Sequence, residues 1–408
     1  MSSRSVAAGR ARHLRLVRSD EAARPRARED AAVRRTIALL LGSTAFLVIG
    51  GLVMVLSASS VSAYSRFGDS FLFFQRQAAY GAVGLGALLL TSRMRYLAWQ
   101  RLALPFLAVT VALLVLVLYP GAAVSAYGSS RWLELGPVTV QPSEIAKLAL
   151  VVFGASVLSR KWGRLDQVAH LALPLLPVTI LVAGLVMLQP DLGTTLIISG
   201  TMFLLLFAAG VRLRYLLVTG IVGAATGMAL IFSADYRRVR FLSFLDPWAD
   251  ASNTGYQLIQ SLIALGSGGW LGVGLGASRQ KWLYVPNAHT DFIFSILGEE
   301  LGLVGELVVL LAFGLVIFAG IRIATRAPDV FGRLLAAGIV GWIGLQALVN
   351  LGAVTGLLPI TGVPLPFLSY GGSSLVVSLA AVGILWSIAR TPPCAGKPIR
   401  QATEGRRR

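Results

Sequence analysis

Long apolar runs alternate with short polar stretches along most of the chain. Ten apolar segments stand out, at about 36–58, 71–91, 102–119, 145–158, 168–188, 193–210, 215–232, 293–320, 334–352 and 373–390. A helix needs about 20 apolar residues to cross a bilayer, and inside hydrocarbon the backbone must satisfy its own hydrogen bonds. The pattern therefore predicts an all-α, polytopic membrane protein with about ten transmembrane helices, several of them short or broken by Gly and Pro.

Basic residues mark every second junction between these segments. In chain order, the six groups are Arg34 and Arg35; Arg93, Arg95 and Arg101; Arg160, Lys161 and Arg164; Arg212 and Arg214; Arg322, Arg326 and Arg333; and Arg390 alone. Because cytoplasmic loops carry an excess of Lys and Arg, we expect both termini in the cytoplasm. The loops around 59–70, 120–143, 233–292 and 353–372 then lie outside.

The same charges predict the domain organisation. Residues 1–35 form a basic, disordered cytoplasmic tail, 36–390 the membrane domain, and 391–408 a second basic cytoplasmic tail. The composition agrees, with 56% hydrophobic and 13% charged residues. Ten of the 36 basic residues precede position 36 and five follow Arg390, so the net charge of +18 indicates membrane orientation and not nucleic-acid binding.

Cysteine and histidine offer little chemistry. Cys394 is the single cysteine, which excludes a disulfide framework and leaves a cysteine nucleophile unsupported. The histidines His13, His170 and His289 are too scattered to indicate a metal cluster.

The long exterior loop at 233–292 is unusually basic. It holds Arg237, Arg238, Arg240, Arg279 and Lys281, which favour an anionic ligand or contact with lipid headgroups, and both alternatives stay open. Its stretch GSGGWLGVGLG lacks the strand–turn–helix setting of a phosphate cradle, so a flexible or tightly packed loop is the better interpretation. No Walker A pattern is present, which argues against an ATP-driven pump.

The stretch PNAHTDFIFSILGEELG places Asp291 at the mouth of an apolar segment, where a bare carboxylate is costly. If a helix includes Asp291, then Gly298 and Gly302 share its face and permit close helix packing, so Asp291 faces the bundle. A helix N-cap explains Asp291 equally well. For Glu299, Glu300 and Glu306, pairing within the bundle is the favoured interpretation.

Two further stretches are polar beside apolar segments. In SSRWLELGPVTVQPSEIAKLAL, Pro142 to Glu144 resemble a helix start, and Glu144 is a partner for Lys147. In PITGVPLPFLSYGGSS, the prolines and glycines exclude a regular helix and favour irregular backbone along a cavity, with hydroxyl groups for hydrogen bonding.

Together with QPDLGTT, these motifs resemble the SEDS family of FtsW, RodA and SpoVE, over roughly 36–390. The stretch AHTDFIFSILGEELGLVG is most similar to the division branch. The resemblance implies a peptidoglycan glycosyltransferase that polymerises lipid II at the outer face of the bacterial cytoplasmic membrane, at the division septum. It implies a class B penicillin-binding protein and other division proteins as partners.

The resemblance also implies site residues. Asp291 matches the essential aspartate, expected to be the general base of an inverting displacement. The expected substrate-binding residues are Arg76, Trp132, Lys147, His289, Ser369, Tyr370, Ser373 and Ser374. Departing diphosphate needs positive charge from Arg, Lys or a divalent cation, Mg²⁺ or Mn²⁺. One departure is Asn287, where the family often has Glu. A lipid II flippase and a noncatalytic scaffold that recruits a transpeptidase are the rival functions.

Overall fold

The computed structural model describes residues 3–119, 123–126, 129–136, 138–164, 168–282, 285 and 288–391. Within them the chain forms twelve α-helices, two short 3₁₀ helices and one small sheet. The helices are α1 (Ser3–Phe67), α2 (Leu72–Arg93), α3 (Tyr96–Leu118), α4 (Pro142–Arg160), α5 (Val168–Leu188), α6 (Leu192–Ala208), α7 (Leu213–Phe232), α8 (Asp235–Leu245), α9 (Tyr256–Gly268), α10 (Ile293–Arg326), α11 (Val330–Val354) and α12 (Gly372–Arg390).

Ten of these helices, all except α8 and α9, coincide with the ten predicted apolar segments. Seven of them are long and apolar enough to cross a membrane, and α6, with 17 residues, is shorter. α2 has 22 residues but begins with the polar stretch Gln75–Arg76–Gln77, which lowers its hydropathy. The prediction of a polytopic helical membrane protein is confirmed, whereas the tail boundaries and the sidedness stay predictions. α1 begins at Ser3, so the structure continues this helix into the segment for which a disordered tail was predicted.

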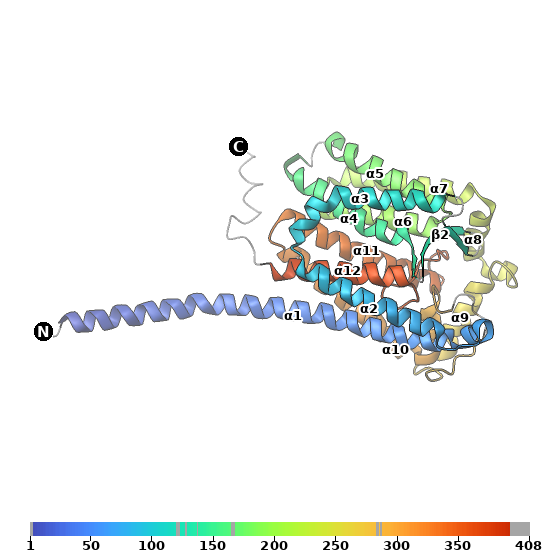
Figure 1. Ribbon diagram of the computed structural model, residues 1–408, viewed down its shortest axis with the longest axis horizontal. Helices are drawn as coiled ribbons and strands as arrows, with labels where there is room; N and C mark the ends of the chain where they lie inside the picture. Colours follow the sequence, from blue (N-terminus) through green and yellow to red (C-terminus); the bar gives the residue numbers. More distant parts are fainter. Residues whose placement is uncertain are drawn as a thin grey trace.

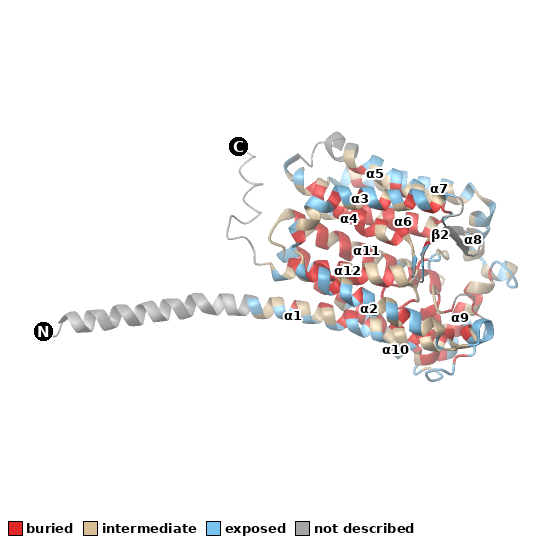
Figure 2. Ribbon diagram, viewed as in Figure 1, coloured by how far each residue is buried: buried red, intermediate tan, exposed pale blue. Residues whose placement is uncertain are grey.

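The membrane helices form a bundle whose axes run roughly side by side (Figure 1). α4 and α11 occupy its centre, and most of their residues are buried (Figure 2). α2 packs along α12, and α1 packs along α10. By contrast α7 buries only Leu216 within the described residues and contacts mainly α6 and α8. The outward face of α7 is apolar, as expected for a helix that contacts lipid.

A small sheet closes one end of the bundle. Its strands are β1 (Ala123–Ala126), β2 (Ser129–Leu135) and β3 (Val138–Val140), all antiparallel with β2 in the middle. Leu133 pairs with Ala123 on one side and Val140 on the other, and its side chain is buried. α8, α9 and the segment between α11 and α12 gather at this same end (Figure 1). The all-α prediction did not anticipate this sheet.

α10 is broken near its start. Gly302 has φ 64° and ψ −169°, a left-handed conformation that favours glycine. The extended segment after α9 fills the break, because Val273 N donates to Glu299 O (2.9 Å) and Leu303 N donates to Gly269 O (2.9 Å). The prediction that Asp291 and Gly302 share one helix face was therefore wrong, because α10 begins after Asp291 and its helical conformation is interrupted at Gly302. The stretch GSGGWLGVGLG packs tightly against α10, which agrees with the interpretation of a tightly packed loop and not with that of a flexible one.

Candidate functional site

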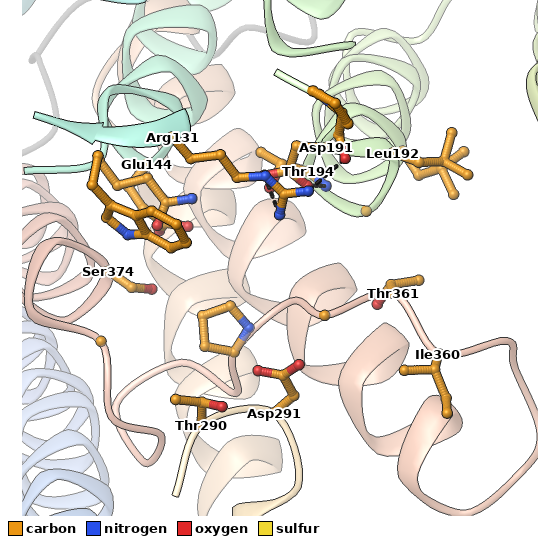
Figure 3. A pocket seen from close by; sticks show the side chains of 18 of the residues that line it. Arg131, Glu144, Asp191, Leu192, Thr194, Thr290, Asp291, Ile360, Thr361 and Ser374 are labelled. Atoms are coloured by element: carbon orange, nitrogen blue, oxygen red, sulfur yellow. Dashed lines mark hydrogen bonds and ion pairs between the residues drawn. The ribbon is translucent and has the colours of Figure 1, made fainter. Parts of the chain in front are cut away.

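A cavity of about 460 Å³ lies at the end of the bundle that carries the sheet. Its walls come from β2 and β3, the first turns of α4, α6 and α12, the helices α7 and α8, and the segments that precede α10 and α12. Residues far apart in the sequence thus meet around one space (Figure 3). The three carboxylates at the cavity are those of Glu144, Asp191 and Asp291.

Asp291 lies on the turn before α10, and neighbouring elements fix its backbone. Asn350 Nδ2 donates to the Asp291 carbonyl (2.8 Å), and Tyr370 N donates to the carbonyl of His289 (2.9 Å). Gly362, with φ 70°, lies beside the carboxyl, and a Cβ there would be in ordinary van der Waals contact with Asp291 Oδ2 (3.5 Å). The alternative of a helix N-cap was wrong, because the N-cap is Phe292 and no side chain caps α10.

The protonation of Asp291 depends on opposing influences. Its removal from bulk water raises the pKa of the carboxyl above the ordinary value, and this is the largest cause. A hydrogen bond from Thr290 and the positive charges of Arg240 and Arg131 act in the opposite direction. The side chain is half-buried and faces the cavity. A carboxylate with a raised pKa and access to a ligand is a suitable general base.

Arg131 and Asp191 form a pair that the sequence analysis did not select. Arg131 Nη1 lies 3.6 Å from Asp191 Oδ2, and Arg131 Nε donates to Gln189 O (3.0 Å). Asp191 also caps α6 by accepting from Thr194 N (3.0 Å). Figure 3 shows this pair across the cavity from Asp291. The sequence marks the two residues only one at a time, since Arg131 precedes the predicted site residue Trp132 and Asp191 belongs to QPDLGTT.

α8 brings two more arginines to the cavity, Arg237 and Arg240. Arg237 Nη1 donates to Leu230 O (2.6 Å), so part of its guanidinium is held by α7. Arg240 is exposed, makes no hydrogen bond to another described residue, and also lines a smaller adjoining cavity. Of the two alternatives for this basic loop, the positions of these arginines favour an anionic ligand.

Four of the predicted substrate-binding residues line the cavity: Trp132, Tyr370, Ser373 and Ser374. The Ser373 hydroxyl accepts from Gln141 N (2.9 Å), which joins the start of α12 to the residue before α4. The Ser374 hydroxyl is buried and has no hydrogen-bond partner among the described residues. The cavity wall therefore carries polar groups that already have a hydrogen-bond partner in the protein and polar groups that have none among the described residues.

The other four predicted residues lie behind or beside the cavity. Lys147 is buried below it and donates to Glu144 Oε1 (2.8 Å) and Gln346 Oε1 (2.7 Å). Ser369 is buried and accepts from Leu365 N (2.9 Å), which stabilises the irregular loop. These two side chains support the cavity wall, and a direct contact with substrate stays a prediction for both.

His289 and Arg76 surround the side chain of Tyr370. The His289 ring lies 4.7 Å from Phe73 and 5.6 Å from Tyr370, measured between centroids. Burial lowers the pKa of His289 to about 4, so this histidine is neutral near pH 7. Arg76 hydrogen-bonds Tyr370, yet burial still raises the pKa of the phenol. These residues hold one edge of the site, while Asn287 lies outside the described residues.

The paired glutamates of α10 act in packing, as favoured from the sequence. Glu299 accepts from Arg279 N (2.9 Å), and Glu300 accepts from the Ser57 hydroxyl (2.6 Å). Lys281 Nζ lies 3.6 Å from Glu300 Oε1. These bonds connect α10 with α1 and with the segment after α9, away from the cavity.

Comparison with known proteins places the chain among cell cycle proteins. The profile of the FtsW, RodA and SpoVE family matches residues 37–392. The probable peptidoglycan glycosyltransferase FtsW of Geobacter metallireducens is 44% identical over 356 residues, which are 87% of this chain and 95% of the relative. The stage V sporulation protein E of Bacillus subtilis is 43% identical over 352 residues, 86% and 96% of the two chains.

Solved structures agree with these relatives. One chain, from a study of how a peptidoglycan synthase complex coordinates polymerization and crosslinking, superposes with a TM-score of 0.71 at 34% identity. That match covers 86% of this chain and 96% of the other. The rod shape determining protein RodA of Thermus thermophilus gives a TM-score of 0.64 at 31% identity, with 86% and 95% covered.

Proposed function

The chain belongs to the FtsW, RodA and SpoVE family of cell cycle proteins and is a peptidoglycan glycosyltransferase, and on this premise we propose that its cavity polymerises lipid II with Asp291 as the general base. The observation that carries this proposal is the place of Asp291. Its half-buried carboxyl, with a raised pKa, faces a cavity that also holds Arg131 and Arg240. A base and a cationic wall in one space suit attack by a hydroxyl and departure of a diphosphate.

The proposed reaction is a single displacement. Asp291 accepts the proton of a sugar hydroxyl while that oxygen attacks the anomeric carbon of a second lipid-linked saccharide. The bond from this carbon to the diphosphate oxygen breaks, and the electron pair leaves with the lipid diphosphate. One displacement inverts the anomeric centre, forms the glycosidic bond and leaves no glycosyl-enzyme.

Arginines are well placed to stabilise the departing diphosphate. Arg131 is oriented by Asp191 and by backbone carbonyls, whereas Arg240 has a guanidinium free to contact a ligand. Guanidinium groups bind phosphate oxygens through charge-assisted hydrogen bonds. Arg76 and Lys147, the basic residues expected at the substrate from the sequence, do not line the cavity, and their contact with substrate stays a prediction.

The described residues do not form a ready site for a divalent cation. No group of three or more His, Cys, Asp or Glu side chains in this part of the chain is arranged to hold a metal ion. The carboxylate of Asp191 already pairs with Arg131 and accepts the hydrogen bond that caps α6. These residues therefore do not fit Mg²⁺ or Mn²⁺, and no step of the proposed reaction depends on either ion.

We further propose that the chain works in a complex, since one structural neighbour belongs to a peptidoglycan synthase complex. The proposed partner is a class B penicillin-binding protein, which crosslinks the glycan that this chain polymerises. The cavity end then faces the outside of the cytoplasmic membrane, with both termini in the cytoplasm. The division septum is the proposed location, from the similarity to FtsW.

Purified protein tests this function against its rivals. With lipid II in detergent, alone and with the partner, we expect glycan strands to form, detected by gel separation of the polymer. A flippase would move lipid II across vesicles and form no polymer, and a scaffold would do neither. Either result contradicts the proposal.

A further inference from the structure

One wall of the cavity carries two buried oxygen atoms that have no hydrogen-bond partner among the described residues. They are Oε2 of Glu144 and Oγ of Ser374. Both residues line the cavity, yet Glu144 is only 1% exposed and Ser374 only 6% exposed. Buried polar atoms are nearly always hydrogen-bonded, because an unmade bond leaves the cost of desolvation uncompensated. These two oxygens are therefore suited to bind a ligand.

The chemistry of Glu144 restricts what that ligand presents. Its other oxygen, Oε1, accepts from Lys147 Nζ at 2.8 Å, and the two groups form a buried ion pair. An ionised carboxylate only accepts hydrogen bonds. The free Oε2 thus requires an O–H or N–H donor, and its negative charge repels a phosphate oxygen.

The neighbours of these atoms favour a saccharide. Trp132 lines the cavity beside β3 and the start of α4, and its indole is half-buried. An aromatic face packs against the C–H groups of a pyranose ring, while the sugar hydroxyls at the ring edge bond to nearby polar groups. Figure 3 shows Glu144 and Ser374 on one side of the cavity, with Asp291 between them and Thr361.

We propose that Glu144, Ser374 and Trp132 form a saccharide subsite, in which Glu144 Oε2 accepts from a sugar hydroxyl or amide N–H and Ser374 bonds a second sugar group. Arg131 and Arg240 bind the diphosphate. This assignment rests on the proposed function of the cavity, and it fixes the orientation of a lipid-linked saccharide with respect to Asp291.

Ser374 allows a clean test because its hydroxyl makes no bond inside the described protein. Ser374→Ala removes no internal hydrogen bond and leaves no new partner unsatisfied, so the fold should keep its thermal stability. Ser378 is a matched control on α12. Its hydroxyl is also buried without a partner among the described residues, but it does not line the cavity.

The experiment measures binding of two ligands to the purified full chain in lipid nanodiscs. The ligands are lipid II and undecaprenyl diphosphate, which lacks the sugars. We expect Ser374→Ala to weaken lipid II binding by about three- to tenfold, the effect of one hydrogen bond, and to leave undecaprenyl diphosphate binding unchanged. Ser378→Ala should change neither affinity, and Arg240→Ala should weaken both.

Equal loss of both ligands in Ser374→Ala overturns the saccharide subsite, and so does unchanged binding of lipid II. Weaker binding of both ligands by Ser378→Ala would show that the affinities respond to the packing of α12 and not to ligand contact. That result would also overturn the subsite. If the unmodified chain binds neither ligand, the proposed function itself fails. That result differs from a subsite that fails while both ligands still bind.

Discussion

At the scale of single residues, the reactivity of Asp291 depends on a balance between partial burial and nearby positive charge. Burial raises the pKa of its carboxyl, and Arg240 and Arg131 oppose that increase. A general base acts in its deprotonated form, so activity should fall as the pH falls through the pKa of Asp291. The acidic side of the pH profile therefore reports the surroundings of this one carboxyl.

Arg240→Ala tests this balance. Without the guanidinium, less positive charge stabilises the carboxylate, so the pKa of Asp291 should rise further and the acidic side of the kcat profile should shift to higher pH. Arg240→Lys keeps the charge and should shift it less. The measurement is polymerisation rate at saturating lipid II from acidic to neutral pH. An unchanged profile in Arg240→Ala would contradict the electrostatic coupling.

The sequence predicted some residues of the site and missed others. Asp291, Trp132 and Ser373 were predicted at the site, because each stands in a long local motif that resembles a family. The pairing of Lys147 with Glu144 was also predicted, since a spacing of three residues puts them on one helix face. Arg131 and Asp191 are 60 positions apart, and no local pattern reveals that β2 lies against the start of α6.

At the scale of elements, the contact between α9 and α10 supports the turn that carries Asp291. Gly268 packs against the α10 backbone so closely that a Cβ there would lie 2.0 Å from Gly298 O. The next residues fill the break at Gly302. Asp291 lies directly before the first half of α10, so a shift of that half would displace the carboxyl.

Two glycines of α9 make a matched pair for this contact. Gly268→Ala should lower the melting temperature and reduce polymerisation, because the backbone of α10 must move to admit the methyl group. Gly266 has nothing within 4 Å of an added Cβ, so Gly266→Ala should be neutral or slightly stabilising. Thermal melting in detergent measures both. Equal melting temperatures for the two variants would argue against tight packing of α9 on α10.

The elements themselves were largely predictable. Apolar runs predicted the ten helices that coincide with them, seven of which are long and apolar enough to cross a membrane, because hydrocarbon leaves the backbone few alternatives to a helix. The sheet was missed, since three short strands in a loop have too few residues for a clear alternation. The break at Gly302 was also missed, because a glycine that enables close helix packing and a glycine that breaks a helix look alike in sequence.

At the scale of the whole molecule, the cavity is lined by residues at the end of the bundle where Figure 1 shows the sheet, α8 and α9. Alternating basic clusters predict that this end faces outward. In a Cys394→Ser background, Ser252→Cys on the exposed stretch before α9 should react with an impermeant thiol reagent in intact cells. The native Cys394 should react only after permeabilisation. The reverse pattern would invert the topology and place the cavity in the cytoplasm.

Asp291 is the proposed base of a lipid II polymerase. Asp291→Asn keeps the size of the side chain and removes its basicity, while the carbonyl that binds Asn350 is unaffected. The direct measurement is the rate of lipid II polymerisation by the purified chain with its partner, alongside expression and melting temperature. We predict a loss of about 10²–10⁴-fold in rate with unchanged expression and melting. A folded Asp291→Asn protein that polymerises lipid II at the normal rate would contradict a role for Asp291 as the base.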